Sequence, residues 1–120
     1  MKKKKITIYG STGSVGNSTL DVLCCHLDKF ELVGLTINKN YKELLKQVKI
    51  HKPKVVAIKD YDAFKKFSSK NSDEDLTILG GESSLIDILE FEVDFNVDGK
   101  LKPSNIIFDT SKLDFLYCAI

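Results

Sequence analysis

Apolar residues along this chain alternate between short continuous runs and longer stretches with helical spacing. Four short runs, rich in β-branched and aromatic residues, predict strands near residues 5–9, 32–37, 55–58 and 76–79. Apolar residues three or four positions apart predict helices over 15–27, 41–52, 61–67 and 85–89. Strands and helices in strict alternation favour an α/β fold, a doubly wound parallel sheet with helices on both faces.

Polar residues mark where two of these helices begin. Asn40 followed by Glu43 has the spacing of a capping box, in which the first side chain bonds a backbone N–H three residues later. Asp60 is a similar cap for the next helix, and Pro53 ends the preceding one. These signals place the helix starts directly after the second and third predicted strands.

The pattern changes after residue 90. Phe91, Val93, Phe95 and Val97 alternate with polar residues, and Asp98-Gly99 follows, which predicts a hairpin. We therefore interpret residues 91–112 as a hairpin or an insertion within a single domain spanning residues 1–120. The final apolar run, 113–120, has no turn or polar cap after it, so we expect a truncated domain.

Charge and cysteine content narrow the class of protein. Lys and Arg number 18 against 17 Asp and Glu, so we expect neither nucleic acid nor a membrane as partner. The apolar stretch after the basic N-terminus is too short for a secretory signal peptide. Cys24, Cys25 and Cys118 are odd in number, and two are adjacent. This pattern indicates core thiols in a reducing, cytoplasmic setting.

The first predicted strand is followed by a glycine-rich segment. Gly10, Gly13 and Gly16 have the spacing G-x-x-G-x-x-G, a variant found in NADP-using Rossmann-like domains. The free N–H groups at the start of the next helix would face a pyrophosphate, and the helix dipole favours its negative charge. A turn without a ligand is the alternative, but the position at the first strand–helix junction favours binding.

The tip of the second predicted strand bears on the choice of cofactor. NAD-specific domains place an acidic residue there for the ribose 2′-hydroxyl. This chain has Asn38-Lys39-Asn40 instead, and a lysine would attract a 2′-phosphate. The segment favours NADP(H), although Lys39 taken alone is indistinguishable from a surface lysine.

Other candidate residues carry weaker signals. His26 and His51 lie near predicted helix ends, where surface histidines are common. Glu82, Asp109 and Asp114 have no recognisable spacing, and no cluster of metal ligands is evident.

The string Gly10-Ser-Thr-Gly-Ser-Val-Gly-Asn-Ser-Thr-Leu-Asp-Val22 resembles the N-terminus of the 1-deoxy-D-xylulose 5-phosphate reductoisomerase family. The resemblance covers residues 4–90 well and 113–120 loosely. It implies that the cofactor is NADPH. By position, it implies that the pyrophosphate is held by Thr12, Gly13, Ser14 and Val15. It likewise implies that the adenosine ribose and its 2′-phosphate are held by Asn38, Lys39 and Asn40.

The resemblance also implies what a full-length protein would do. Members of the family convert 1-deoxy-D-xylulose 5-phosphate to 2-C-methyl-D-erythritol 4-phosphate in non-mevalonate isoprenoid biosynthesis, using NADPH and a divalent metal, Mn²⁺ or Mg²⁺. A full-length protein would be a homodimer that binds this sugar phosphate. The family's catalytic, metal and substrate motifs lie beyond residue 120, so we expect no catalytic residue and no metal ligand here, and an inactive chain.

Two alternatives remain open. The chain could be the cofactor domain of another NADP-dependent dehydrogenase, such as a semialdehyde dehydrogenase, although the string from Ser18 to Val22 argues against it. It could also be a non-catalytic nucleotide-binding module.

Overall fold

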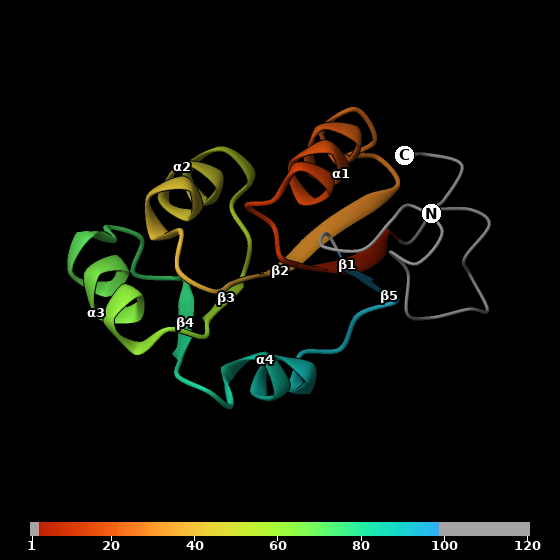
Figure 1. Ribbon diagram of the computed structural model, residues 1–120. Coiled ribbons are helices and arrows are strands. Elements are labelled where there is room, and N and C mark those ends of the chain that lie inside the picture. The colour runs from red at the N-terminus through yellow and green to blue at the C-terminus, as the bar shows by residue number, and fades with distance from the viewer. Residues whose placement is uncertain (1–2, 99–120) are drawn as a thin grey trace.

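The computed structural model describes residues 3–98 of the 120-residue chain. Strands and helices alternate through most of this part (Figure 1). The strands are β1 (Lys4–Tyr9), β2 (Phe30–Ile37), β3 (Val55–Ile58), β4 (Thr77–Gly80) and β5 (Phe95–Asp98). The helices are α1 (Ser14–Cys24), α2 (Tyr41–His51), α3 (Tyr61–Lys70), α4 (Ser84–Asp87) and the 3₁₀-helix η1 (Ile88–Glu90).

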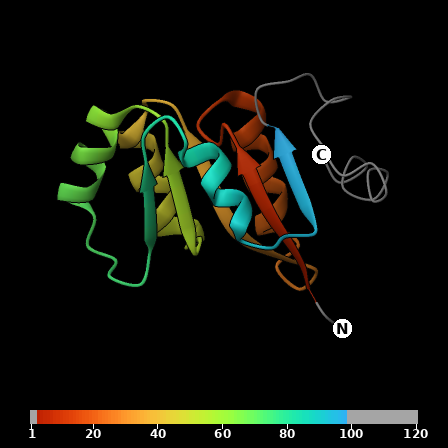
Figure 2. The same cartoon turned by 90° about the horizontal axis from the view of Figure 1, so that it is seen from below.

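The five strands form one sheet in the order β4-β3-β2-β1-β5, and each adjacent pair is parallel. Helices α1, α2 and α3 cover one face of the sheet, and α4 covers the other (Figures 1 and 2). The predicted doubly wound parallel sheet is therefore confirmed. The chain runs outward from β1 to β4 and then returns to place β5 on the other side of β1, so the direction of winding reverses at β1.

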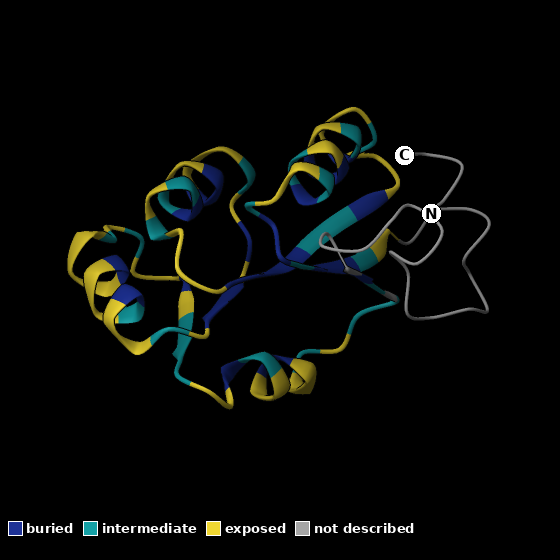
Figure 3. Ribbon diagram, viewed as in Figure 1, coloured by how far each residue is buried: buried dark blue, intermediate teal, exposed yellow. Residues whose placement is uncertain are grey.

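Two apolar clusters hold the helices to the sheet. The strands at the centre of the sheet are coloured mainly as buried in Figure 3. Strand β3 is fully buried along its whole length, as expected for a central strand of a parallel sheet. Its Val56 and Ile58 belong to the cluster beneath α1, α2 and α3, while Val55 and Ala57 belong to the cluster beneath α4. Tyr9, at the end of β1, donates its hydroxyl to the carbonyl oxygen of Leu85 at 3.2 Å and so ties α4 to the sheet.

Both predicted helix caps are confirmed. Asn40 accepts a hydrogen bond from the N–H of Glu43 at 3.3 Å, and Asp60 accepts one from the N–H of Ala63 at 3.0 Å. Helix α2 ends at His51, and its C-cap is Lys52, which has a left-handed φ of 49° and directly precedes Pro53. These local signals fix where the chain enters α2 and α3 after leaving the sheet.

Helix α1 is shorter than predicted. The apolar spacing suggested a helix to Leu27, but α1 ends at Cys24, and the N–H of His26 bonds the carbonyl of Leu23 at 3.0 Å in a tighter turn. Leu27 is 59% exposed, so nothing in the core holds another helical turn. Cys24 and Cys25 are exposed rather than core residues, which corrects that prediction, and Cys118 lies outside the described residues.

The last predicted helix is also corrected. The spacing of Leu85, Ile86 and Leu89 predicted a helix over 85–89, but Ile86 is 70% exposed and Leu89 is 56% exposed. Helix α4 spans only four residues before the chain tightens into η1. Ile88, the first residue of η1, packs on the sheet instead and is 1% exposed.

The alternating segment near residue 91 forms a strand only at its end. Strand β5 pairs with β1 in parallel, with Ile6 opposite Phe95 and Ile8 opposite Val97. Phe91 and Val93 pack instead against the cluster beneath α4. The turn predicted at 98–99, the second arm of the hairpin and the run 113–120 lie outside the described residues.

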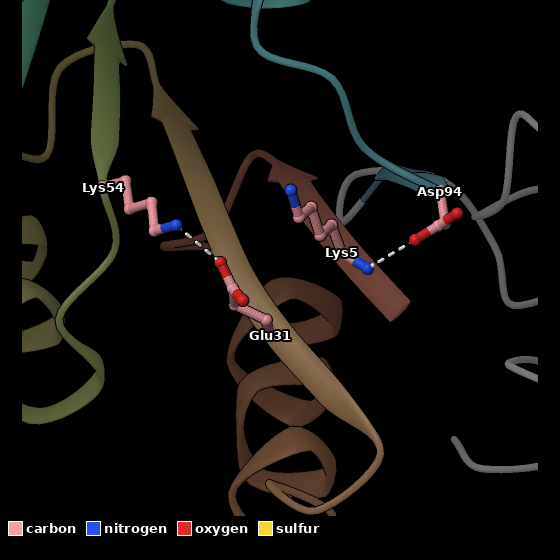
Figure 4. Close-up of polar contacts among 4 residues, drawn as sticks. All are labelled: Lys5, Glu31, Lys54 and Asp94. Carbon is pink, nitrogen blue, oxygen red and sulfur yellow. Dashed lines mark hydrogen bonds and ion pairs between the residues drawn. The ribbon is translucent and has the colours of Figure 1, made fainter. Parts of the chain in front are cut away.

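Polar contacts join the strands near their amino ends (Figure 4). The backbone N–H of Lys5 donates to the Asp94 carboxylate at 2.7 Å, which seats the chain entering β5 against β1. Lys54 and Glu31 form an ion pair at 2.8 Å between β3 and β2, and the hydrogen bond from Lys54 lowers the pKa of Glu31. Lys54 is 63% exposed and Glu31 is 33% exposed, so solvent screens the pair and it adds little to stability. Within residues 3–98, none of the helices has the length and apolarity that crossing a bilayer requires.

Phe67 is the largest of the fully buried side chains, and it fastens α3 to the sheet. Replacing it with alanine should lower the free energy of unfolding by about 3–5 kcal/mol, because it removes buried apolar surface and leaves a cavity. Leu89→Ala, at a position 56% exposed, is the matched control and should change it by roughly 0.5 kcal/mol or less. Urea denaturation measures both. A cost below about 1 kcal/mol for Phe67→Ala would contradict the described packing.

Candidate functional site

Two polar segments follow neighbouring parallel strands at the same edge of the sheet. The segment that begins at Gly10 follows β1, and Asn38 follows β2. Tyr9 lies opposite Thr36 in the register, so both segments leave the sheet side by side. Because β1 is also where the winding reverses, this edge is the place at which open α/β sheets bind their ligands. The fold therefore brings together the two segments that the sequence singled out.

The glycine-rich turn is tied to β2 by its backbone. Gly10, with a φ of 76°, donates its N–H to the carbonyl and hydroxyl oxygens of Thr36, at 2.9 and 3.1 Å. Ser11 donates its N–H to the same carbonyl at 3.0 Å. A left-handed φ of this kind is unstrained in glycine and costly in other residues, which accounts for Gly10 at this turn.

The third glycine lets α1 pack directly on the turn. A Cβ added at Gly16 would lie 2.4 Å from the carbonyl oxygen of Gly10 and 2.7 Å from the Cα of Ser11. Both neighbours are backbone atoms, so neither can move aside without distorting the turn. Gly16 therefore sets how closely the start of α1 approaches the end of β1.

The N-terminus of α1 differs from those of α2 and α3. Its N-cap is Gly13, with no side-chain cap and no acidic residue in the first turn. By contrast, α2 and α3 have the capping side chains Asn40 and Asp60. The backbone N–H groups of Ser14 and Val15 find no acceptor among residues 3–98. These groups and the positive end of the helix dipole are therefore available to an anion.

The four residues predicted to hold a pyrophosphate surround this helix start. Gly13 and Ser14 are exposed, Thr12 is half-buried, and Val15 is half-buried against the core beneath α1. The arrangement thus leaves hydroxyl and N–H donors at the surface while an apolar side chain anchors the first turn.

The three residues at the tip of β2 are all exposed. The carbonyl of Asn38 accepts from the N–H of Asp60 at 3.0 Å, which joins this tip to the start of α3. The Asn40 oxygen is used in capping α2, so its amide nitrogen is the group left to donate to a ligand. The Asp60 carboxylate caps α3, and Lys39 is the charged residue of the tip.

Sequence reasoning overlooked the polar residues that support the turn. Gln47 is 3% exposed and bonds Ser11, which is itself fully buried. The available signal was an uncharged polar residue on the apolar face of α2, between Leu44 and Val48. A polar side chain at a core position needs a partner, and here the partner is the glycine-rich turn.

The remaining candidates lie away from this edge or form no cluster. The Cys24 sulfur lies 3.3 Å from Nδ1 of His51, where α1 and α2 end. Burial lowers the pKa of His51, against an opposing effect of Asp21. His26 is half-buried and Glu82 is exposed, while Asp109 and Asp114 lie outside the described residues.

A hollow of about 590 Å³ lies at the opposite edge of the sheet, lined in part by Lys52, Pro53, Lys54, Asn71 and Asp73. These residues precede β3 and β4, whereas the glycine-rich turn follows β1. Among the described residues, no three His, Cys, Asp or Glu side chains gather as a metal-binding group. The edge holding the turn therefore remains the candidate site.

Comparison with known proteins identifies relatives of this chain. The family model of 1-deoxy-D-xylulose 5-phosphate reductoisomerase matches residues 6–99. The reductoisomerase of Caldanaerobacter subterraneus subsp. tengcongensis is 45% identical over 94 residues, which cover 78% of this chain and 24% of the relative. The chain thus spans about a quarter of the length of this curated relative.

Solved structures agree with the sequence relatives. The reductoisomerase of Zymomonas mobilis in complex with NADPH superposes with a TM-score of 0.74 at 26% identity, covering 80% of this chain and 25% of that one. A reductoisomerase in complex with NADPH, fosmidomycin and magnesium has a TM-score of 0.71 at 31% identity, covering 78% of this chain and 24% of that one. Because the family model matches most of its length, the chain belongs to the 1-deoxy-D-xylulose 5-phosphate reductoisomerase family.

Proposed function

We propose that this chain is the NADPH-binding N-terminal portion of a reductoisomerase. The observation that carries the proposal is the uncapped N-terminus of α1 at the glycine-rich turn, beside the lysine at the tip of β2. Its support comes from the two relatives above, whose solved structures contain NADPH. When bound, NADPH supplies a hydride, and the protein binds and orients the cofactor.

The pyrophosphate belongs at the start of α1. The N–H groups of Ser14 and Val15 donate to its oxygens, and Gly13, which has no side chain, leaves room for a close approach of the backbone. The Thr12 hydroxyl adds a further donor. An acidic residue in the first turn of α1 would repel the pyrophosphate, and α1 has none there.

The ribose and its 2′-phosphate belong at the tip of β2. Lys39 supplies the positive charge, while the amides of Asn38 and Asn40 donate hydrogen bonds. The Asp60 carboxylate is turned to the N–H of Ala63 and serves as a helix cap. This charge arrangement favours NADPH over NADH.

The full reaction is a proposal for the full-length protein. It converts 1-deoxy-D-xylulose 5-phosphate to 2-C-methyl-D-erythritol 4-phosphate in isoprenoid biosynthesis, as a cytoplasmic homodimer without nucleic-acid or membrane partners. The described residues do not fit the Mn²⁺ or Mg²⁺ of this reaction, because they form no group of three metal-ligating side chains. We therefore assign the metal to residues other than 3–98. The resemblance to the family places the sugar phosphate there as well, with the substrate motifs expected beyond residue 120.

Changing the charge at Lys39 tests the cofactor site. Lys39→Glu should raise the dissociation constant of NADPH roughly tenfold and that of NADH about twofold or less, because only NADPH carries the 2′-phosphate. Lys49→Glu makes the same charge change at the exposed end of α2, far from the tip, and should leave both constants nearly unchanged. Titration calorimetry of the 120-residue chain measures them. Equal losses for both cofactors would refute the assignment of Lys39, and failure of the unmodified chain to bind either cofactor would refute the proposed function.

Turnover by the isolated chain is the second test. Purified residues 1–120, given 1-deoxy-D-xylulose 5-phosphate, NADPH and Mn²⁺, should oxidise no NADPH above background. Hydride transfer needs a substrate held about 3–3.5 Å from the nicotinamide, and we assign the groups that hold it elsewhere. The decay of NADPH absorbance measures the rate, with EDTA as the control for metal dependence. Metal-dependent oxidation would show that the active site lies within this chain.

A further inference from the structure

One buried side chain connects α2 to the glycine-rich turn. Gln47 is 3% exposed, and both ends of its amide are hydrogen-bonded. Its Oε1 accepts from the Ser11 hydroxyl at 2.8 Å, and its Nε2 donates to the Ser11 carbonyl oxygen at 2.8 Å. Gln47 therefore forms hydrogen bonds with both the side chain and the backbone of Ser11.

The same amide reaches the turn by a second route. Gln47 Nε2 also donates to Asn17 Oδ1 at 2.9 Å. The Asn17 amide nitrogen in turn lies 3.2 Å from the carbonyl oxygens of Thr12 and of Gly13, to which it donates. Three consecutive carbonyls of the turn are thus held, directly or through Asn17, from the side of α2.

Holding these carbonyls fixes where the N–H groups point. In a trans peptide the C=O of one residue and the N–H of the next point in opposite directions, and the described residues contain no cis peptide. The Ser11 carbonyl accepts a hydrogen bond from Gln47, so the N–H of Thr12 points away from Gln47. The Gly13 carbonyl accepts one from Asn17, so the N–H of Ser14 points away from Asn17.

We propose that Gln47 is a positioning residue for the dinucleotide: it orients the turn so that the N–H groups of Thr12 and Ser14 face the pyrophosphate. This inference rests on the proposed function. A glycine-rich turn without such support samples many conformations, and ordering it on binding costs conformational entropy. Because the hydrogen bonds from Gln47 order the turn beforehand, the binding free energy of the cofactor is not reduced by this cost. The pyrophosphate is common to both nicotinamide cofactors, so Gln47 strengthens binding of NADPH and NADH alike, whereas Lys39 discriminates between them.

Gln47→Met is the first variant to test, because it keeps the length of the side chain and removes all three hydrogen bonds. The dissociation constants of NADPH and NADH should both rise about tenfold, with their ratio unchanged within twofold. Thr19→Val is the matched control. It removes a part-buried hydrogen bond of α1, from the hydroxyl of the buried Thr19 to the Val15 carbonyl, and leaves the bonds to the turn in place. It should leave binding within twofold of the unmodified chain.

Gln47→Glu gives a readout that a purely structural role would not move. A carboxylate at this position faces the carbonyl oxygen of Ser11 and Oδ1 of Asn17, both acceptors, and should weaken binding more than methionine does. Burial raises the pKa of such a carboxyl group, and its protonated form can donate to the Ser11 carbonyl. The dissociation constant of NADH for Gln47→Glu, divided by that of the unmodified chain at the same pH, should therefore be smaller at mildly acidic pH than at neutral pH. Gln47→Met should show no such recovery.

All titrations are made on the 120-residue chain below the melting temperature of every variant, with circular dichroism as the check on folding. A folded Gln47→Met that binds both cofactors within twofold of the unmodified chain would overturn the inference. So would a Thr19→Val loss as large as that of Gln47→Met, or a Gln47→Glu loss that is independent of pH. An unmodified chain that binds neither cofactor would instead refute the proposed function, and this inference with it.

Discussion

The parallel pairing of β1 with β2 is the constraint on which the rest of the molecule depends. It brings the two strands to the same edge of the sheet, and Thr36 then accepts the N–H groups of Gly10 and Ser11 as the chain turns out of β1. A shift of one residue in this register would turn the Ile6 and Ile8 side chains, both fully buried, out of the cluster beneath α1, α2 and α3 to the opposite face of the sheet, and would move the turn away from Thr36. The burial that stabilises the fold therefore also fixes the geometry of the site.

Polar groups buried next to an apolar core add a second requirement. Ser11 and Gln47 are both almost fully buried, and each would be costly without a partner. They satisfy one another at 2.8 Å, so the turn and α2 are stable together rather than separately. A pair of this kind contributes little net stability but excludes other arrangements of the turn, since any rearrangement leaves a buried polar group unpaired.

The sequence predicted what depends on local pattern and left out what depends on distant partners. Strands with continuous apolar residues, and the caps at Asn40 and Asp60, could be recognised because each is encoded within a few residues. The end of α1 at Cys24 could not, because it depends on whether a core exists beside Leu27. The direction in which β5 pairs is likewise a property of the whole sheet.

The candidate site was predictable to the same extent. Gly10, Gly13 and Lys39 were evident from their places after the first two strands, where chain direction alone carries them to one edge. Gln47 lies 36 residues from Ser11 and shows its role only once α2 is docked on the sheet. Its polar character on an apolar helix face was visible, but the group that it satisfies was not.

Helix α2 thereby serves both halves of the site. It begins just after its N-cap Asn40, next in sequence to the lysine at the tip of β2, and two turns later it presents Gln47 to the turn after β1. Leu44, between these points, is fully buried and fixes the helix on the sheet. Because the helix is rigid over this distance, the spacing between the glycine-rich turn and the charged tip is set by one packed element rather than by two independent loops. In the site that we propose, a ligand with phosphates at both positions would meet two ends that are already spaced, which reduces the ordering that binding must impose.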